Sequence, residues 1–199
     1  MIVLGLTGSI GMGKSTVARM FEEEGAPSFN SDGAVHVLYA PGGAGVAPVE
    51  AAFPGVTRDG GIDRDLLSAR VVGNEPAIKQ LEQIVHPLVR QMQAEFLQSN
   101  RDAGTKVVVL DIPLLFEGSG AKFVDKVAMV SAPADVQHAR VLARPGMTEA
   151  KFEAILARQM PDAEKRARAT HIVETLSIDS TRAYVQALVS HIRQGRSHA

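Results

Sequence analysis

A glycine-rich stretch near the start of the chain has residues of the types and spacing that bind phosphate. Gly8, Gly13, Lys14 and Ser15 follow the pattern Gly-x-x-x-x-Gly-Lys-Ser, which is the Walker A motif. Glycines let successive backbone N–H groups turn toward phosphate oxygens, and a helix that follows directs its positive end to the same place. A lysine at this position reaches the β- and γ-phosphates, and the serine hydroxyl can hold Mg²⁺. The spacing therefore predicts a site for a nucleotide and Mg²⁺.

The residues around this loop decide between such a site and a plain glycine turn with a solvated lysine. The apolar run Ile2–Thr7 precedes the loop, as a strand in a covered parallel sheet should. Val17, Met20 and Phe21 follow on one face of a helical pattern that stops at Gly25. A strand before and a helix after are the context that the motif requires. The residues expected to bind the nucleotide are Gly8, Gly11, Met12, Gly13, Lys14, Ser15 and Thr16.

Two aspartates stand where predicted strands end. Asp32 follows a short strand at 26–30, and Asp111 ends Lys106–Asp111, the best buried strand of the chain. Functional sites of α/β proteins form at the carboxyl ends of parallel strands. One carboxylate could accept a proton and the other hold Mg²⁺ through water, and the sequence leaves open which does which. The alternatives are an N-cap for Asp32 and a turn cap for Asp111.

A basic segment lies late in the chain. From His138 to Arg168 there are seven Lys/Arg and four Asp/Glu, a local charge of +3 in a chain of net charge −1. Arg140 and Arg144 are four residues apart, so they share one face of a predicted helix. These features predict a lid in which both arginines bring positive charge to a polyphosphate. A helical hairpin with ordinary surface charge is the alternative.

Predicted strands and helices alternate at both ends of the chain but not in its middle. No convincing strand lies between about Gly33 and Asn100, where a long helix from Pro76 is expected to kink or break near His86 because Pro87 lies inside it. This pattern predicts an α/β fold with a parallel sheet and a helical insertion. The expected parts are a nucleotide-binding core of 1–32, 101–137 and 169–199, a substrate-binding insertion of 33–100, and a lid of 138–168. The other elements expected are the strands Lys126–Ser131 and His171–Glu174 and the helices Val46–Phe53, Asp63–Val72, Pro133–Arg144, Thr148–Met160 and Asp179–Gln194.

Length and composition limit the classes of protein that this chain could be. Its 199 residues, 45% hydrophobic and 22% charged, suit one principal globular domain. The absence of cysteine excludes disulfides, thiolate nucleophiles and Cys-based zinc sites. A net charge of −1 argues against a globally basic nucleic-acid binder. With no secretory signal and no apolar run long enough to span a membrane, we expect a cytoplasmic protein without nucleic-acid or membrane partners, and a monomer.

Several motifs, taken in order, resemble those of the dephospho-CoA kinase family, and the match covers nearly the whole chain. The set that includes His86-Pro87 and Pro113–Glu117 is far more selective than the phosphate loop, which many families share. Neither an Asp-x-x-Gly switch nor an Asn-Lys-x-Asp guanine reader is present, as a GTPase would require. The matching stretches are Leu6–Thr16, Asp32, Gly61–Arg64, His86-Pro87, Asp111–Glu117, the pair Arg140 and Arg144, and Gln159.

The resemblance implies a three-layer α/β/α kinase with a five-stranded parallel sheet, which uses ATP and Mg²⁺ to phosphorylate the ribose 3′-hydroxyl of dephospho-CoA. It implies that Asp32 is the base, that Arg140 and Arg144 act on ATP, and that Ser15 and Asp111 serve the metal. Another small-molecule kinase, or a regulatory P-loop NTPase, is the alternative function. The residues that the resemblance places near the substrate are Asp32, Arg64, His86, Leu114 and Glu117.

Some of these positions have other interpretations, and the chain departs from the family pattern twice. Arg64 could form a surface ion pair with Asp63 or Asp65, and His86 could be a structural histidine that is hydrogen-bonded at the helix break. For Glu117 we favour anchoring of the loop after the third strand. Asn30 stands where the family usually has a first aspartate, and Glu174-Thr175 stands where the family often has Asp-Asn near the adenine site.

Overall fold

The computed structural model describes residues 1–118 and 120–195, which form two compact units. Unit 1 combines Met1–Phe29 with the chain from Asn100 onward, and unit 2 is Asn30–Ser99. The expected insertion, 33–100, covers nearly the same stretch as unit 2, whereas the expected lid, 138–168, is part of unit 1. Residues 196–199 of the expected core lie outside the described residues. None of the described helices is both long and apolar enough to cross a membrane.

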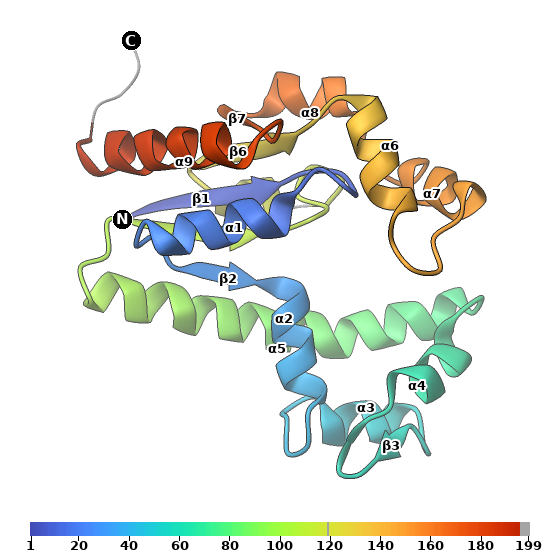
Figure 1. Ribbon diagram of the computed structural model, residues 1–199. Helices are drawn as coiled ribbons and strands as arrows, with labels where there is room; N and C mark the ends of the chain where they lie inside the picture. Colours follow the sequence, from blue (N-terminus) through green and yellow to red (C-terminus); the bar gives the residue numbers. More distant parts are fainter. Residues whose placement is uncertain (119, 196–199) are drawn as a thin grey trace. The chain divides into compact units, whose positions relative to one another are not determined.

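Unit 1 is built on a five-stranded sheet with the order β2-β5-β1-β6-β7 (Figure 1). The central strand, β1, pairs in parallel with β5, where Leu4 lies opposite Val109, and with β6, where Leu6 lies opposite Ala128. Apolar residues fill both faces of β1, so the strand needs cover on both sides. The predicted α/β fold with a five-stranded parallel sheet is confirmed. The strands are β1 (Ile2–Thr7), β2 (Ser28–Asn30), β5 (Val107–Asp111), β6 (Lys126–Ser131) and β7 (His171–Glu174).

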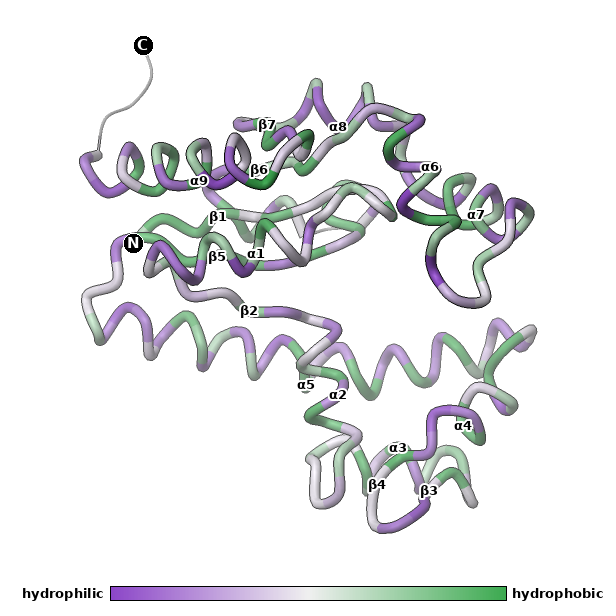
Figure 2. The backbone as a smooth tube through the Cα atoms, in the orientation of Figure 1, coloured by the Kyte–Doolittle hydropathy of each residue, from purple (hydrophilic) through white to green (hydrophobic). Residues whose placement is uncertain are grey.

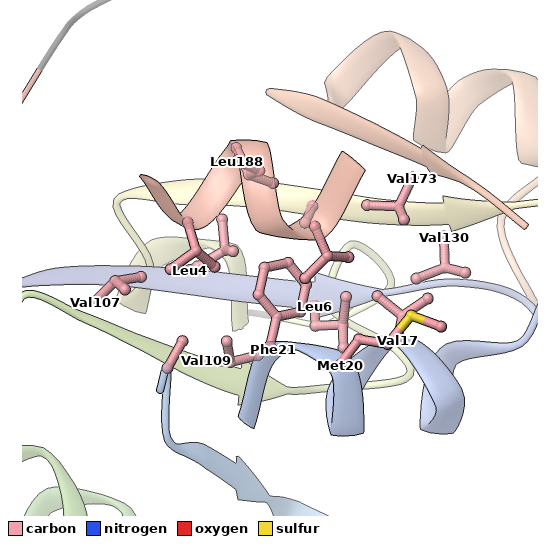
Figure 3. Packing of buried hydrophobic residues seen from close by; sticks show 14 of the residues in the cluster. Leu4, Leu6, Val17, Met20, Phe21, Val107, Val109, Val130, Val173 and Leu188 are labelled. Atoms are coloured by element: carbon pink, nitrogen blue, oxygen red, sulfur yellow. The ribbon is translucent and has the colours of Figure 1, made fainter. Parts of the chain in front are cut away.

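Two helices, α1 and α9, pack side by side against this sheet (Figure 1). Figure 3 shows Leu6 of β1, Phe21 of α1 and Leu188 of α9 in one buried cluster. Hydrophobic and hydrophilic residues alternate along α9 (Figure 2), so one face of this helix is apolar enough to join the cluster. The helices of unit 1 are α1 (Lys14–Glu23), α6 (Ala134–Leu142), α7 (Glu149–Leu156), α8 (Asp162–Arg168), α9 (Ile178–Arg193) and the short 3-10 helix η1 (Gly120–Phe123).

Unit 2 has a hydrophobic core of its own, in which Leu38, Val49, Phe53 and Leu67 are buried. The long helix α5 contributes Val85 to this core. A cluster that is separate from the sheet explains how this stretch can fold as a unit. Its elements are α2 (Ser31–Tyr39), α3 (Val46–Ala52), β3 (Thr57–Arg58), β4 (Gly61–Ile62), α4 (Arg64–Val71) and most of α5 (Glu75–Asp102).

Three expectations about these elements are wrong. α5 runs without a break through Pro87, because the buried apolar face around Val85 holds the helix despite one missing N–H donor. The middle of the chain contains a hairpin, β3–β4, whose Asp59-Gly60 turn has φ of 51° and 81°, as a two-residue hairpin requires. The basic segment contains an additional helix, α8, and Gln159 lies beyond the end of α7.

Candidate active site

The loop between β1 and α1 has the backbone of a phosphate-binding loop. Gly13 is the N-cap residue of α1 with φ of 89°, and Gly11 has φ of 79°, values that glycine adopts without strain. A Cβ on Gly11 would lie 2.4 Å from Cγ2 of Val141, so α6 packs directly on the loop there. The N–H of Thr16 donates to the carbonyl oxygen of Gly13 at 3.1 Å. The N–H groups of Lys14 and Ser15 precede the first bonds of the helix and are available to an anion. Gly8 opens this loop, and Ser15 and Thr16 lie in the first turn of α1.

Lys14 and Asp111 form an ion pair at the carboxyl ends of β1 and β5. Asp111 is 2% exposed, and the Lys14 side chain is 15% exposed. A buried carboxylate is stable only when an opposite charge and hydrogen bonds compensate its lost hydration. The ammonium of Lys14 therefore supports Asp111, and the view of Lys14 as a solvated lysine is wrong.

The oxygen donors beside the loop suit Mg²⁺. The Ser15 hydroxyl and the Asp111 carboxylate are hard ligands, which Mg²⁺ prefers. Within residues 1–118 and 120–195 there is no group of three or more His, Cys, Asp or Glu side chains that could hold a metal ion by themselves. Few protein ligands are typical of Mg²⁺ sites in which water and substrate phosphates complete the octahedron. The donor set therefore fits a metal that arrives with a nucleotide.

A cavity of about 370 Å³ adjoins the loop. Arg140 reaches it from α6 and donates hydrogen bonds to Oγ1 and O of Thr175, at 3.0 and 2.6 Å. Oγ1 of Thr175 in turn donates to the carbonyl oxygen of Met12, at 2.8 Å. Arg144 is exposed at the same cavity, and no described carboxylate pairs with either guanidinium. The lining residues are Gly11, Gly13, Thr16, Val17, Met20, Arg140, Arg144, Thr175, Leu176, Ser177, Ile178 and Thr181.

Glu117 ties the loop after β5 to the segment that connects α7 with α8. Its Oε1 accepts a hydrogen bond from the backbone N–H of Met160 at 2.8 Å and lies 2.9 Å from Nζ of Lys165, whose side chain is wholly buried. Burial raises the pKa of the Glu117 carboxyl, but Lys165 and the N–H of Met160 outweigh this effect and lower it overall. Glu117 therefore anchors this loop. Leu114, in the same loop, is 49% exposed.

We expect Glu117→Gln to lower the free energy of unfolding by about 3–5 kcal/mol at neutral pH, because the buried Lys165 ammonium loses its counter-charge. The double variant Glu117→Gln/Lys165→Met should recover most of this loss. Because the pKa of Glu117 is lowered in the folded state, its stabilisation is present above the unfolded pKa of about 4.3 and is lost as pH falls through the folded value. The deficit of the variant should therefore shrink in acid.

Urea unfolding at pH 7 and at successively lower pH values measures these differences. Glu75→Gln is the matched control, since Glu75 forms an exposed ion pair with Lys79 one turn away, and such pairs contribute only about 0.3–0.5 kcal/mol. Equal stability of the Glu117 and Glu75 variants at pH 7 would contradict the anchoring role.

Unit 2 carries the remaining candidates, beginning with Asp32. The carboxylate of Asp32 is exposed in the first turn of α2. The N-cap residue is Asn30, whose Oδ1 accepts the hydrogen bond from the N–H of Gly33 at 2.8 Å. The alternative in which Asp32 caps the helix is therefore wrong, and the asparagine that departs from the family pattern performs that task. Asp32 itself has no hydrogen bond or ion pair with any described residue.

The surroundings of Arg64 and His86 also rule out the alternative interpretations of these two residues. Asp63 caps α4 and pairs with Arg58, so the expected ion pair of Arg64 with Asp63 or Asp65 is not formed. The Arg64 guanidinium instead lies 6.0 Å from the ring centroid of Tyr39 and 3.5 Å from Nδ1 of His36. His86 is exposed on an unbroken helix and has no hydrogen-bond partner in the described part of the chain. The interpretation of His86 as a structural histidine is wrong.

The contacts of three residues of unit 1 were not predicted from the sequence, although Thr175 was noted as a departure from the family pattern: Gln137, Lys165 and Thr175. Thr175 had the clearest signal, because it directly follows β7, where a parallel sheet forms its sites. Gln137 and Lys165 lie within helical patterns, and nothing in their spacing distinguishes them from surface residues. Their partners, Ile10 and Glu117, are more than forty residues away in the chain.

A glycine-rich loop that follows a central parallel strand and carries a Lys–Asp pair is typical of P-loop kinases. So are arginines at the adjoining cavity, and here Arg140 and Arg144 lie there without a carboxylate partner among the described residues. The sequence matches the family model for dephospho-CoA kinase over residues 2–179. It is 56% identical to a dephospho-CoA kinase of Cereibacter sphaeroides over 191 residues. This aligned stretch covers 96% of this chain and 95% of the relative. The chain therefore belongs to the dephospho-CoA kinase family, and it is an ATP-dependent kinase.

Solved structures agree with this assignment. A Thermus thermophilus protein superposes with a TM-score of 0.80 and 31% identity over 98% of each chain. A dephospho-CoA kinase from Campylobacter jejuni has a TM-score of 0.67 and 25% identity, over 97% of this chain and 98% of its own. Both similarities extend over the sheet and the inserted helices alike, since they cover nearly the full length.

Proposed function

We propose that this enzyme transfers the γ-phosphoryl group of ATP to the ribose 3′-hydroxyl of dephospho-CoA, giving CoA and ADP. The observation that carries the proposal is a phosphate loop with a Lys14–Asp111 pair, beside a cavity that Arg140 and Arg144 line. Neither arginine pairs with a carboxylate in the described part of the chain. This combination suits a polyphosphate whose terminal group must be transferred. Family membership supports dephospho-CoA as the acceptor.

The nucleotide contacts follow from this arrangement. The N–H groups at the start of α1 and the loop residues from Gly8 to Thr16 bind the phosphates, and Lys14 supplies positive charge to the transferring group. The base of ATP occupies the cavity beside Thr175, and Arg140 and Arg144 neutralise charge that develops in the transition state. This division is supported by Arg140, whose guanidinium is already oriented by two hydrogen bonds to Thr175.

The two aspartates receive different roles in our proposal. Asp111 is buried against Lys14 and lies on the phosphate side, so it serves Mg²⁺ together with Ser15. Mg²⁺, when bound there, would neutralise negative charge on the phosphates. Asp32 is exposed and has no partner among the described residues, so its carboxylate is available to accept the proton of the attacking hydroxyl.

Arg64, His86 and Leu114 are proposed to contact dephospho-CoA. The guanidinium of Arg64 rests near Tyr39 without a carboxylate partner among the described residues, so its charge is available to a phosphate group of the substrate. His86 and Leu114 are both exposed, so each side chain is accessible to a ligand. We place the enzyme in the cytoplasm, where ATP is available.

Arg144→Lys is expected to lower kcat by about tenfold or more, because lysine keeps the charge but loses the planar set of donors that holds a phosphate at two points. The melting temperature should not change, since Arg144 is exposed. Steady-state kinetics and thermal unfolding measure both quantities. Arg19→Lys, on the exposed side of α1, is the control. Wild-type kinetics in the Arg144 variant would support the ordinary helical hairpin instead of a lid.

Single-turnover ATP consumption tests the proposed function. With enzyme in excess over ATP, ADP should form rapidly when dephospho-CoA is present and only slowly without it. Adenosine and shikimate, offered as other alcohols, should not replace it. ATP consumption at one rate with and without dephospho-CoA would favour a regulatory NTPase.

A further inference from the structure

One residue of the phosphate loop, Ile10, is held at both of its backbone polar groups by glutamine side chains. The N–H of Ile10 donates to Oε1 of Gln159 at 3.1 Å. The carbonyl oxygen of Ile10 accepts from Nε2 of Gln137 at 2.7 Å. The chemistry fixes the orientation of both amides, because an N–H needs an acceptor and a carbonyl needs a donor. Figure 1 shows the loop that follows β1 beside α6, the helix that carries Gln137.

Gln137 is held firmly in place by its surroundings. It is 7% exposed, and its backbone lies against Gly11, where an added Cβ would come within 3.1 Å of the Gln137 carbonyl oxygen. A buried amide that lost its partner would keep the cost of its lost hydration. This side of the contact is therefore determined by the packing of α6 on the loop.

Gln159 is fixed differently, through the residues that follow it. The N–H of Met160 donates to Glu117, and the carboxylate of Asp162 accepts from the Ser131 hydroxyl at 3.0 Å. The segment on the carboxyl side of Gln159 is thus attached to the loop after β5 and to the end of β6. The anchored backbone next to half-buried Gln159 restricts the positions that its amide oxygen can take.

The two glutamines bracket the basic segment that carries Arg140 and Arg144. Gln137 lies one turn before Arg140 on α6, and Gln159 lies where the chain returns after α7. We propose that Gln137 and Gln159 are positioning residues, which clamp the phosphate loop at Ile10 and couple its conformation to the segment bearing the arginines. The proposal rests on the proposed function in one respect, that this loop binds the phosphates of ATP.

A coupling of this kind has a distinct kinetic consequence. A loop that is held in its binding conformation does not pay an ordering cost when ATP arrives. Loss of the clamp should therefore weaken ATP binding and lower kcat/KM for ATP, whereas KM for dephospho-CoA should not change. A purely structural role would instead lower thermal stability and leave the ATP parameters of the folded enzyme unchanged.

The test compares the same charge change on the two sides of Ile10. Gln159→Glu keeps an acceptor for the N–H, whereas Gln137→Glu sets a carboxylate against a carbonyl oxygen. Both variants add one negative charge near the loop, and the neutral variants control for the different burial of the two side chains. The dissociation constant for ATP, measured by calorimetry without acceptor, should rise about ten- to one-hundred-fold more in Gln137→Glu than in Gln159→Glu.

Neutral variants separate the clamp from charge and from folding. Gln159→Met removes the acceptor with little change of shape and should raise the dissociation constant for ATP about five- to tenfold. Gln137→Met serves the same purpose should the buried carboxylate prevent folding. Gln186→Met, on the exposed face of α9, is the matched control and should bind ATP as the wild type does.

Equal ATP affinity in Gln159→Met and wild type, or equal losses in the two glutamate variants, would overturn the proposal. Because calorimetry with ATP needs no acceptor, these results are independent of whether dephospho-CoA is the substrate. A wild-type enzyme that binds ATP but phosphorylates no dephospho-CoA would refute the proposed function and leave the clamp standing.

Discussion

Lys14→Met is expected to lower kcat by about 10²–10³-fold or more, the largest effect of any single change considered. The ammonium is the positive charge closest to the transferring phosphoryl group in our proposal, and removal of one such donor costs about 3–4 kcal/mol of transition-state stabilisation. Steady-state assays at saturating ATP and dephospho-CoA measure the loss.

The ion pair with Asp111 requires a control for stability. Lys14→Met leaves a carboxylate that is 2% exposed without its counter-charge, so the variant should also unfold more easily. The double variant Lys14→Met/Asp111→Asn should regain the melting temperature but not the activity. A Lys14→Met enzyme with near-normal kcat would show that the loop does not act on the γ-phosphate.

Asp32→Asn is expected to lower kcat by about 10²-fold or more with ATP affinity unchanged, as loss of a general base predicts. The melting temperature should stay the same, because Asn30 and not Asp32 caps α2. Stopped assays with purified variant, together with calorimetric ATP binding, measure both.

Asn30→Ala should have the opposite effect: it should lower the stability of the protein and leave kcat unchanged. It removes the acceptor for the N–H of Gly33 and should lower stability by about 0.5–2 kcal/mol. If Asp32→Asn kept its kcat and melted at a lower temperature, Asp32 would be a structural residue after all, and the base would have to be found elsewhere.

The strands of the nucleotide core could be predicted closely because their patterns are local. Ile2–Thr7 and Lys126–Ser131 are short apolar runs bounded by turn residues, and both are strands over those same residues. The glycines at 11 and 13 likewise indicated the loop, because glycine is the residue that adopts positive φ values without strain.

What could not be predicted depends on contacts between distant residues. The pairing of Lys14 with Asp111 joins the start of α1 to the end of β5, which are far apart in sequence. The helix that passes through Pro87 continues because of a core formed by other elements of unit 2. The β3–β4 hairpin could not be predicted, because two-residue strands are too short to show an alternating pattern.

The amides that hold Ile10 illustrate the same limit at the site. Gln159 stood out only because it belongs to the ordered set of motifs, and Gln137 did not stand out at all. Their common partner becomes visible once α6 and the segment after α7 are folded beside the loop. Local sequence identifies which groups could do chemistry, and tertiary contacts determine how those groups are oriented.

Identification of the phosphorylated position tests the central claim most directly. Purified enzyme should be incubated with ATP, Mg²⁺ and dephospho-CoA, and the product examined by mass spectrometry and by ¹H–³¹P correlation NMR. We predict one added phosphoryl group per molecule, coupled to the proton on the ribose 3′ carbon, with one ADP formed for each. A product phosphorylated elsewhere, or ADP formed without any phosphorylated product, would contradict the assignment of this chain as the kinase that completes CoA.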